Sequence, residues 1–337
     1  MKNPVNVAVV GATGAVGETM LKVLAERDFP IAELHLLASE RSAGEKVDFK
    51  NRKIVVQDLA TFDPTGVDIA LFSAGGDISK EYGPKFAQAG AVVIDNSSAF
   101  RYMDDVPLVV SEVNPEALKN RPRGIVANPN CSTMQLMVAL APIHREVGIE
   151  RINIATYQSV SGTGRRALEE LGRQTAAMLN FQDPKPEVYP VQIAFNVIPH
   201  GGDFLENGYT SEEMKLVWET RKILGDDSIL VNPTVVRVPV FYGHSEAVHI
   251  ETREKITAER ARELLEASPG LEVVDDREPG GYPTPVTHAS GNDAVYVGRI
   301  REDISHPRGL SLWVTADNIR KGAALNAVQL AELVIAE

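Results

Sequence analysis

The 337-residue chain is long enough for about two domains, and its 44% hydrophobic and 24% charged residues exclude a disordered, collagen-like or coiled-coil protein. Its 34 Lys and Arg residues against 46 Asp and Glu residues give a net charge of -12, which argues against nucleic acid as a partner. No apolar run approaches the roughly 18 residues of a membrane span, and one cysteine excludes an internal disulfide and a Cys-x-x-Cys metal site, so we expect a cytoplasmic protein that uses no metal.

The first part of the chain alternates short β-branched runs with segments of helical spacing. The predicted strands are residues 5–10, 31–37, 67–72, 91–94 and 125–127, with helices at 18–27 and 79–89. This alternation predicts a Rossmann-type, doubly wound parallel sheet over residues 1–127.

From residue 128 the strands become longer and more alternating, which predicts an open mixed sheet with one solvated face. The predicted strands are 151–160, 235–240, 246–252, 295–301 and 310–314, with helices at 169–179, 211–224 and 325–335 and a loop at 275–292. We therefore expect an α+β domain over residues 128–316, and a C-terminal helical segment, 317–337, that completes the first domain.

Three glycines, Gly11, Gly14 and Gly17, stand three apart where the first strand turns into the first helix. A dinucleotide site needs a tight turn there, backbone close to the pyrophosphate, and a helix N-terminus whose N–H groups face the anion. The alternative is an ordinary strand-to-helix turn, but the position after the first strand favours a cofactor. The predicted pyrophosphate site is Gly11, Thr13, Gly14, Ala15, Val16 and Gly17.

The end of the second strand indicates which dinucleotide binds. Ser39 stands where an NAD-specific fold carries an acidic residue, roughly 20 residues after the glycine motif. Arg41 and Ser42 follow, and a guanidinium with hydroxyl groups suits a 2′-phosphate. Glu40 would repel that phosphate, so we expect its side chain to point into solvent. These residues predict NADP.

Cys131 lies in the polar sequence NPNCST, between a short strand and a helix predicted from Ser132 onward. A helix N-terminus stabilises a thiolate, and its N–H groups can hold an oxyanion. The alternative is a buried, inert cysteine, which the polar loop disfavours. A thiol beside a nicotinamide suits aldehyde oxidation through a thioester, and this chemistry needs a base. Spacing leaves His200 and His244, each beside a glycine, as equal candidates.

Several motifs together resemble the bacterial type of the aspartate-semialdehyde dehydrogenase family. They are GATGAVG, SERSAG, NPNCST, TYQSVSGTG, EEMK, VRVPVFYGHSE and DNIRKGAALNAVQLAE. The resemblance runs from Val5 to the C-terminus. It implies an NADP- and phosphate-dependent interconversion of L-aspartate 4-semialdehyde and 4-phospho-L-aspartate, which serves lysine, diaminopimelate, methionine, threonine and isoleucine biosynthesis. It also implies a homodimer or homotetramer assembled through the second domain, which is the catalytic and dimerisation domain.

The resemblance assigns roles to positions that match the family motifs. Cys131 matches the nucleophile, His244 the acid/base and Gln158 the residue that orients the substrate. Arg237 matches the group that binds the substrate carboxylate, and Glu212 the one that binds its ammonium. The remaining matches are Arg101 and Lys215 for phosphate, Asn130 for substrate, and Ser161, Gly162 and Asn318 for cofactor.

Local sequence supports two of these assignments. Thr210 and Glu213 have the spacing of a capping box, which makes Glu213 structural and leaves Glu212 for a ligand. Arg237 sits in a strand of Val and Pro, where an unpaired cation is costly.

Two other functions fit the same chemistry less well. An N-acetyl-glutamyl-phosphate reductase would use the same cysteine and histidine, but its substrate has no free ammonium for Glu212 to bind. A cofactor-binding regulator without catalysis has no need for the set Cys131, Gln158, Arg237 and His244.

Overall fold

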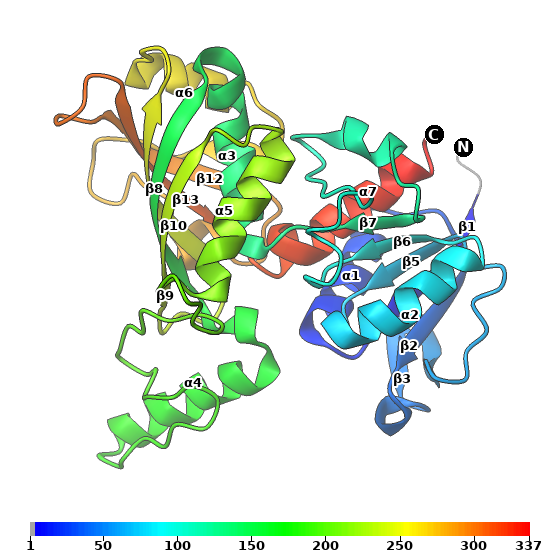
Figure 1. Cartoon of the computed structure of the whole chain (residues 1–337). Coiled ribbons are helices and arrows are strands. Elements are labelled where there is room, and N and C mark those ends of the chain that lie inside the picture. The colour runs from blue at the N-terminus through cyan, green and yellow to red at the C-terminus, as the bar shows by residue number, and fades with distance from the viewer. Residues whose placement is uncertain (1–3) are drawn as a thin grey trace. The chain divides into compact units, whose positions relative to one another are not determined.

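The structure is a computed structural model that describes residues 4–337, so the first three residues of the expected domain 1–127 lie outside it. The chain forms two compact units, one of residues up to Asn130 together with Ala323–Glu337, and the other Cys131–Gly322 (Figure 1). The divisions were expected after residues 127 and 316. Asn128 is hydrogen-bonded to Asn96 and Asn326 and therefore belongs to the first unit. Asn318 is hydrogen-bonded to Ser159 and therefore belongs to the second.

The first unit contains a seven-stranded sheet in the order β3-β4-β2-β1-β5-β6-β7. Its strands are β1 (Val5–Val10), β2 (Ile31–Ala38), β3 (Lys46–Phe49), β4 (Arg52–Asp58), β5 (Ile69–Phe72), β6 (Val92–Asp95) and β7 (Ile125–Ala127). All neighbours are parallel except β3 and β4, an antiparallel hairpin that sequence analysis missed. The hairpin is rich in exposed charged residues, so it lacks the apolar run that marks a buried strand.

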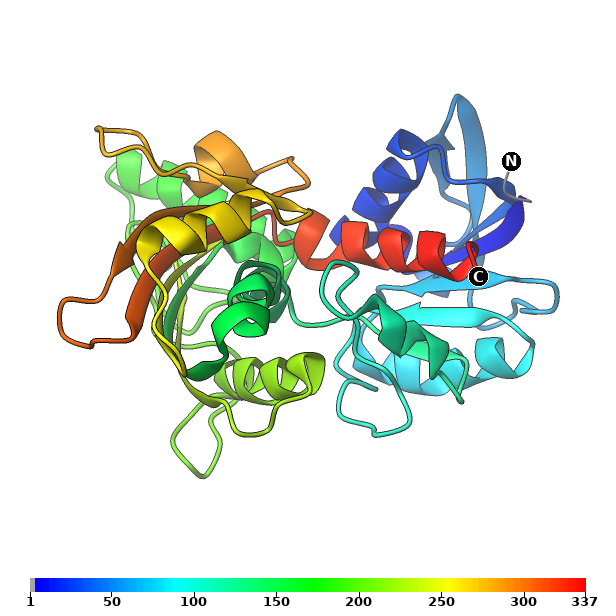
Figure 2. The ribbon, with the colours of Figure 1, turned by 90° about the horizontal axis from the view of Figure 1, so that it is seen from above.

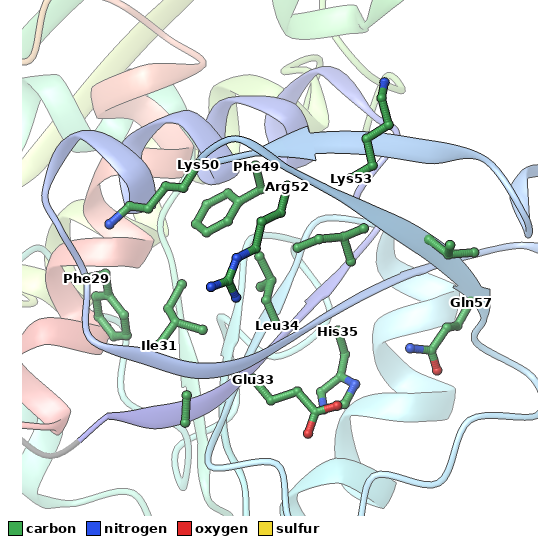
Figure 3. A pocket seen from close by; sticks show the side chains of 13 residues that line it. Phe29, Ile31, Glu33, Leu34, His35, Phe49, Lys50, Arg52, Lys53 and Gln57 are labelled. Carbon is green, nitrogen blue, oxygen red and sulfur yellow. The ribbon is translucent and has the colours of Figure 1, made fainter.

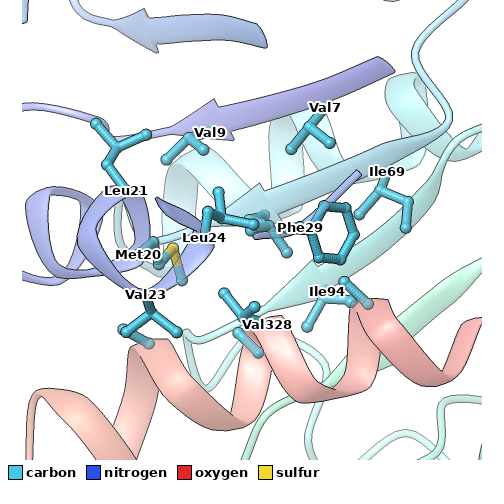
Figure 4. Packing of buried hydrophobic residues seen from close by; sticks show 14 of the residues in the cluster. Val7, Val9, Met20, Leu21, Val23, Leu24, Phe29, Ile69, Ile94 and Val328 are labelled. Atoms are coloured by element: carbon cyan, nitrogen blue, oxygen red, sulfur yellow. The ribbon is translucent and has the colours of Figure 1, made fainter. Parts of the chain in front are cut away.

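Helices cover both faces of this sheet, which confirms the doubly wound fold. Helices α1 (Ala15–Glu26) and α7 (Asn326–Val334) lie together on one face (Figure 2). There Met20 and Leu24 of α1 and Val328 of α7 pack with Val7 and Val9 of β1 (Figure 4). Helix α2 (Gly76–Gln88) covers the other face, where the Phe86 ring meets Phe72 edge-on at 5.4 Å. The shorter elements of this unit are the 3-10 helices η1 (Glu40–Ser42) and η2 (Pro115–Lys119), while the π-helix η5 (Arg320–Leu325) leads into α7.

The second unit contains a six-stranded sheet in the order β11-β12-β13-β10-β8-β9. Its strands are β8 (Ile149–Gln158), β9 (Leu230–Arg237), β10 (His244–Thr252), β11 (Leu271–Val273), β12 (Val295–Glu302) and β13 (Gly309–Ala316). The pairs β8/β9 and β11/β12 are parallel and the others antiparallel, which confirms the open mixed sheet.

One face of this second sheet is covered and the other is more open. Helix α3 (Cys131–Val147) packs on the covered face, flanked by α5 (Ser211–Leu224) and α6 (Ala258–Glu266) (Figure 1). The remaining elements are α4 (Arg165–Leu179), the 3-10 helix η3 (Val160–Thr163) and the π-helix η4 (Pro285–Ala289), which lies within the expected loop 275–292. Sequence analysis did not predict α6 or β11. None of the helices within residues 4–337 is long and apolar enough to cross a membrane.

Candidate active site

The glycine turn has the geometry of an anion-binding turn. Gly11 has φ +85°, and a Cβ there would lie 2.9 Å from the Ser73 carbonyl carbon. A Cβ on Gly17 would lie 2.2 Å from the Gly11 oxygen, so both positions require glycine. Gly14 is the N-cap of α1 and, having no side chain, gives no capping hydrogen bond to the N–H groups of the first turn. Thr13 lies in the strand-to-helix turn, and Ala15 and Val16 are the first residues of α1, so the site fits a pyrophosphate.

The residues expected at the 2′-phosphate lie at the end of β2. Ser39 directly follows that strand and is the N-cap of η1. Ser39 and Arg41 are exposed and Ser42 is half-buried, so all three side chains are accessible from solvent. Glu40 is also exposed, as expected for a side chain in solvent. The carboxyl edge of the sheet thus offers a guanidinium and two hydroxyl groups beside the glycine turn.

Cys131 is the first residue of α3, one residue earlier than the predicted start, and is partly exposed. The first turn of α3 contains no acidic residue that would oppose a thiolate there. A Cβ on Gly322 would lie 2.8 Å from the Cys131 Cβ, so only glycine fits against the cysteine. Sequence analysis did not select Gly322, although it lies in the quoted motif DNIRKGAALN.

Gln158 ends β8 beside the first turn of α3. Its Nε2 donates to Ser132 Oγ at 2.6 Å, while its Oε1 is buried without a hydrogen-bond partner in the described chain. In the β8/β9 register Gln158 stands opposite Arg237. The Gln158 amide and the Arg237 guanidinium therefore lie at the carboxyl ends of the neighbouring strands β8 and β9.

Ser159 links His244 to Arg237, a role that sequence analysis missed. Its backbone N–H donates to His244 Nδ1 at 3.0 Å, and its carbonyl accepts from Arg237 Nη1 at 2.8 Å. Ser159 lies within TYQSVSGTG, between the selected Gln158 and Ser161, but a backbone contact leaves no mark on the residue type. The ring of His200 packs instead on Phe204, with centroids 4.8 Å apart.

His244 is fully buried, and its imidazole is neutral. Burial and, to a smaller extent, the nearby Arg237 lower its pKa to about 3, although Glu212 and the Gly243 backbone act in the opposite direction. His244 Nε2 has no hydrogen-bond partner in residues 4–337. A Cβ on Gly162 would lie 3.2 Å from this nitrogen and from Arg237 Nη1, so glycine at 162 leaves room beside both groups.

Arg237 keeps an unused donor. It is 8% exposed, and its Nε is buried without a partner in the described part of the chain. A buried guanidinium donor left unpaired is costly, and a carboxylate ligand would relieve that cost.

Glu212 and Lys215 pair with each other on α5, with Nζ and Oε2 2.6 Å apart. The predicted capping box is confirmed, because Thr210 Oγ1 accepts from the Glu213 N–H and Glu213 Oε2 accepts from the Thr210 N–H. Glu213 Oε1 also accepts from the Val235 N–H, which joins α5 to β9. Glu213 is therefore structural, whereas Glu212 and Lys215 pair with each other on the same helix.

Arg101 and Asn130 belong to the first unit. Arg101 is 5% exposed, and its Nε and Nη2 donate to the carbonyls of Asn128 and Asn96 at 2.9 and 2.7 Å. Those carbonyls follow β7 and β6, so Arg101 is fixed at the carboxyl edge of the first sheet. Asn130 is buried and directly precedes Cys131 in the chain.

Ser161 and Asn318, expected at the cofactor, lie in the His244 cluster. Asn318 Oδ1 accepts from Ser159 Oγ at 3.0 Å, Ser161 Oγ at 3.1 Å and the Gly243 N–H at 3.0 Å. Gly243 directly precedes His244, so Asn318 holds both chain segments that flank the imidazole.

Glu246 lies on the same face of β10 as His244 and is fully buried. Neither of its carboxyl oxygens has a hydrogen-bond partner in the described residues. Burial raises its pKa well above the usual 4.5, and only Gln135 opposes this. Burial therefore favours the neutral form of Glu246 in the folded chain.

We expect Glu246→Gln to stabilise the protein increasingly as pH rises. Above pH 4.5, the usual pKa, the unfolded carboxyl ionises while the folded one keeps its proton, so wild-type stability falls with pH by up to about 1.4 kcal/mol per unit until the folded pKa is reached. Glutamine removes this loss. The melting temperature of the variant minus that of the wild type should grow as pH rises above about 5. Glu251→Gln, on the opposite face of the same strand, is the matched control, and a flat difference for Glu246→Gln would refute a neutral buried acid.

A cavity of about 650 Å³ lies elsewhere in the first unit, where β2 and β4 diverge (Figure 3). Phe29, Ile31 and Phe49 line it together with the Arg52 side chain. It contains none of the predicted site residues of the described chain.

Within residues 4–337, no group of three or more His, Cys, Asp or Glu side chains could hold a metal ion.

Two family models match this chain. The model "Semialdehyde dehydrogenase, NAD binding domain" matches residues 6–121, and "Semialdehyde dehydrogenase, dimerisation domain" matches residues 140–321. Among curated relatives, aspartate-semialdehyde dehydrogenase of Legionella pneumophila is 60% identical over 99% of this chain and 96% of its own length. Aspartate-semialdehyde dehydrogenase 2 of Vibrio cholerae is 58% identical over 99% of both chains.

Solved structures agree with these relatives. Aspartate semialdehyde dehydrogenase II of Vibrio cholerae, complexed with ASA, superposes with a TM-score of 0.97 at 57% identity over 99% of both chains. The aspartate semialdehyde dehydrogenase of Candida albicans with NADP superposes with a TM-score of 0.76 at 25% identity over 98% of both chains.

Proposed function

The chain belongs to the aspartate-semialdehyde dehydrogenase family, and from this we propose that it catalyses the NADP- and phosphate-dependent oxidation of L-aspartate 4-semialdehyde to 4-phospho-L-aspartate, and the reverse. It is an oxidoreductase of the phosphorylating aldehyde dehydrogenase class with NADP as its cofactor. One observation carries the proposed mechanism. Gln158, Ser159, Arg237 and His244 form a cluster in the second unit, and this unit also contains Cys131, the first residue of α3.

The proposed reaction has two halves. The Cys131 thiolate adds to the aldehyde carbon, and a hydride leaves that carbon, so that a thioester forms on the sulfur. Bound NADP⁺ supplies the hydride acceptor. A phosphate oxygen then attacks the thioester carbonyl, the carbon–sulfur bond breaks, and 4-phospho-L-aspartate leaves while the thiolate returns.

The other residues bind and orient the substrate in this proposal. Arg237 takes the substrate carboxylate through its unused Nε edge, and Glu212 takes the ammonium. Gln158 directs its free Oε1 to the substrate, with Asn130 beside the cysteine.

Arg101 and Lys215 are proposed to bind phosphate. Because Lys215 and Glu212 form an ion pair, both must exchange partners when substrate and phosphate bind. Such an exchange replaces one ion pair with two, so neither Glu212 nor Lys215 is left as a single unpaired charge.

One assay tests the proposed function directly. Purified protein should reduce NADP⁺ with L-aspartate semialdehyde, and omission of phosphate should stop turnover after one thioester has formed per site. An N-acetyl-glutamyl-phosphate reductase would instead prefer N-acetyl-glutamate semialdehyde, and a regulator without catalysis would bind NADP but give no turnover. Either result would contradict the proposal.

The second unit carries surfaces suited to self-association, and we propose a homodimer or homotetramer. The family model over residues 140–321 is a dimerisation domain. The open face of its sheet presents Tyr157, 36% exposed, and Trp313. After α4 the chain also exposes Phe181, Phe195 and Phe204. Exposed aromatic side chains of this kind mark an interface, and light scattering would give the oligomeric state of the protein.

A cytoplasmic location stays a prediction of the sequence.

The cofactor preference is expected to depend on Arg41. Arg41→Ala removes the proposed cation at the 2′-phosphate, so kcat/KM with NADP should fall by about tenfold or more while kcat/KM with NAD changes little. Arg52→Ala, an exposed cation of the same unit, is the control. If Arg41→Ala lowered kcat/KM equally with NADP and with NAD, the 2′-phosphate would have to bind elsewhere.

A further inference from the structure

The first residue of helix α7, Asn326, has a fully buried side chain to which the proposed reaction gives no role. Its amide is hydrogen-bonded on both sides within the first unit. Oδ1 accepts from the Ser111 N–H at 3.0 Å, while Nδ2 donates to the Val109 carbonyl at 2.9 Å and to Asn128 Oδ1 at 2.6 Å. Apolar side chains such as Val328 already attach α7 to the core, so the polar contacts of Asn326 serve a further purpose.

Backbone groups fix which way these amides point. The Ser111 N–H can only donate, so the Asn326 atom that faces it is Oδ1, and Nδ2 must face Asn128. Asn128 therefore accepts with Oδ1, and its Nδ2 donates to Asn96 Oδ1 at 2.7 Å and to the Ala323 carbonyl at 3.2 Å. No hydroxyl hydrogen enters this assignment. We call Asn326, Asn128 and Asn96 the asparagine chain.

Two members of the asparagine chain also hold Arg101, through their backbone carbonyls. Arg101 Nε donates to the Asn128 carbonyl at 2.9 Å, and Nη2 donates to the Asn96 carbonyl at 2.7 Å. Asn96 and Asn128 directly follow β6 and β7, so their side chains join the two strand ends while their carbonyls orient the guanidinium. The asparagine chain thus connects the start of α7 to Arg101 through Asn128.

A guanidinium that is already fixed binds an anion more tightly than a mobile one. An arginine side chain has several rotatable bonds, and any freedom that it keeps before binding is lost when a ligand orders it. Hydrogen bonds to two fixed carbonyls remove part of that freedom in advance. The position of the Asn128 backbone therefore affects how well Arg101 binds an anion.

We propose that Asn326 is a positioning residue for phosphate, which holds Asn128 and, through it, the Arg101 guanidinium in the orientation that binds the anion. This inference rests on the proposed function of Arg101. Asn326 acts on the anion only through Asn128 and Arg101. Without the Asn326 amide, Asn128 Oδ1 loses a donor in a buried place, and its residue shifts together with the carbonyl that orients Arg101.

Asn326→Leu removes the amide at nearly constant size. Because Asn128 then loses its donor, we expect the KM for phosphate to rise by about five- to tenfold, the effect of one hydrogen bond on binding. The kcat at saturating phosphate and the KM values for L-aspartate semialdehyde and NADP⁺ should stay within about twofold of wild type. A fall in kcat with an unchanged KM for phosphate would show a role in folding alone and overturn the proposal.

Gln329→Ala is the matched control. Gln329 lies one turn later on α7, where its Nε2 donates to Glu112 at 3.1 Å, so the variant also loosens the helix but leaves Asn128 untouched. Its KM for phosphate should equal that of the wild type. If Gln329→Ala and Asn326→Leu raised this KM equally, the effect would come from α7 as a whole and the proposal would fail. Asn326→Ser, whose shorter side chain cannot reach both Ser111 and Asn128, replaces Asn326→Leu if the leucine variant does not fold.

A measurement without substrate separates this inference from the proposed function of Arg101. A buried, hydrogen-bonded Nε–H exchanges slowly with water, and the signal of Arg101 is the one that Arg101→Lys removes from the ¹⁵N spectrum. We expect Asn326→Leu to accelerate this exchange by about tenfold or more, and Gln329→Ala to leave it unchanged. Unaltered exchange in Asn326→Leu would overturn the positioning role. If the exchange accelerates but Arg101→Lys leaves the KM for phosphate unchanged, the proposed function of Arg101 is wrong, while the asparagine chain still orients its side chain.

Discussion

Replacing Cys131 with alanine should abolish turnover while leaving NADP binding unchanged. The sulfur forms the proposed covalent bond to the substrate, and removal of a covalent nucleophile costs about 10³-fold or more in kcat. The glycine turn and the residues after β2 lie on other segments of the chain, so the Kd for NADP should not move. Steady-state kinetics and a fluorescence titration with NADPH measure the two effects.

The single cysteine makes the covalent step easy to follow. Wild-type protein mixed with 4-phospho-L-aspartate, in the absence of NADPH, should gain the mass of one aspartyl thioester. Cys131→Ala should gain none. Cys131→Ser is the conservative control, because it keeps size and polarity at the start of α3 but provides a poorer nucleophile. Undiminished turnover in Cys131→Ala would refute covalent catalysis.

Arg237→Lys should weaken transition-state stabilisation, measured through kcat/KM, by about 2–3 kcal/mol, which is the contribution of a charge-assisted hydrogen bond. This corresponds to roughly 30- to 150-fold. Lysine keeps the positive charge but loses the paired donors that fit a carboxylate. It also loses the bond from Arg237 Nη1 to the Ser159 carbonyl. Because remote binding orients the aldehyde, kcat should fall together with the rise in KM.

The same site predicts strong rejection of an acetylated substrate. Acetylation removes the substrate ammonium and adds bulk near Glu212, so N-acetylated semialdehydes should react with kcat/KM lower by about 10³-fold or more. Because Lys215 leaves Glu212 to bind phosphate in the proposed reaction, an acetylated substrate would leave Glu212 without its ammonium partner.

Two controls complete the substrate test. Arg260→Lys changes an exposed arginine of the same unit, paired with Glu146, and should leave kcat/KM unchanged. Substitution of Arg101 or Lys215 should raise the KM for phosphate more than that for the semialdehyde. Comparable kcat/KM for N-acetyl-glutamate semialdehyde and aspartate semialdehyde would favour the reductase.

The sequence by itself determined the parts of this protein that depend on local pattern. The strands 5–10 and 125–127 and the helix 211–224 have the bounds that the structure gives, because buried apolar runs and a capping box mark their ends. Gly11 and Gly17 could be identified from their spacing, because a side chain at either position would clash with backbone in or beside the strand-to-helix turn. The β3–β4 hairpin was missed because its charged, exposed strands lack a hydrophobic signal.

Only the tertiary structure decided how residues far apart in the chain act together. Spacing could not choose between His200 and His244, whereas the fold brings the Ser159 N–H to His244 and leaves His200 against Phe204. Ser159 acts through its backbone, and Gly322 through the space it leaves for Cys131, so neither role is visible in residue type alone. The raised pKa of Glu246 likewise arises from burial, which depends on sheet and helix packing and not on neighbouring residues in the sequence.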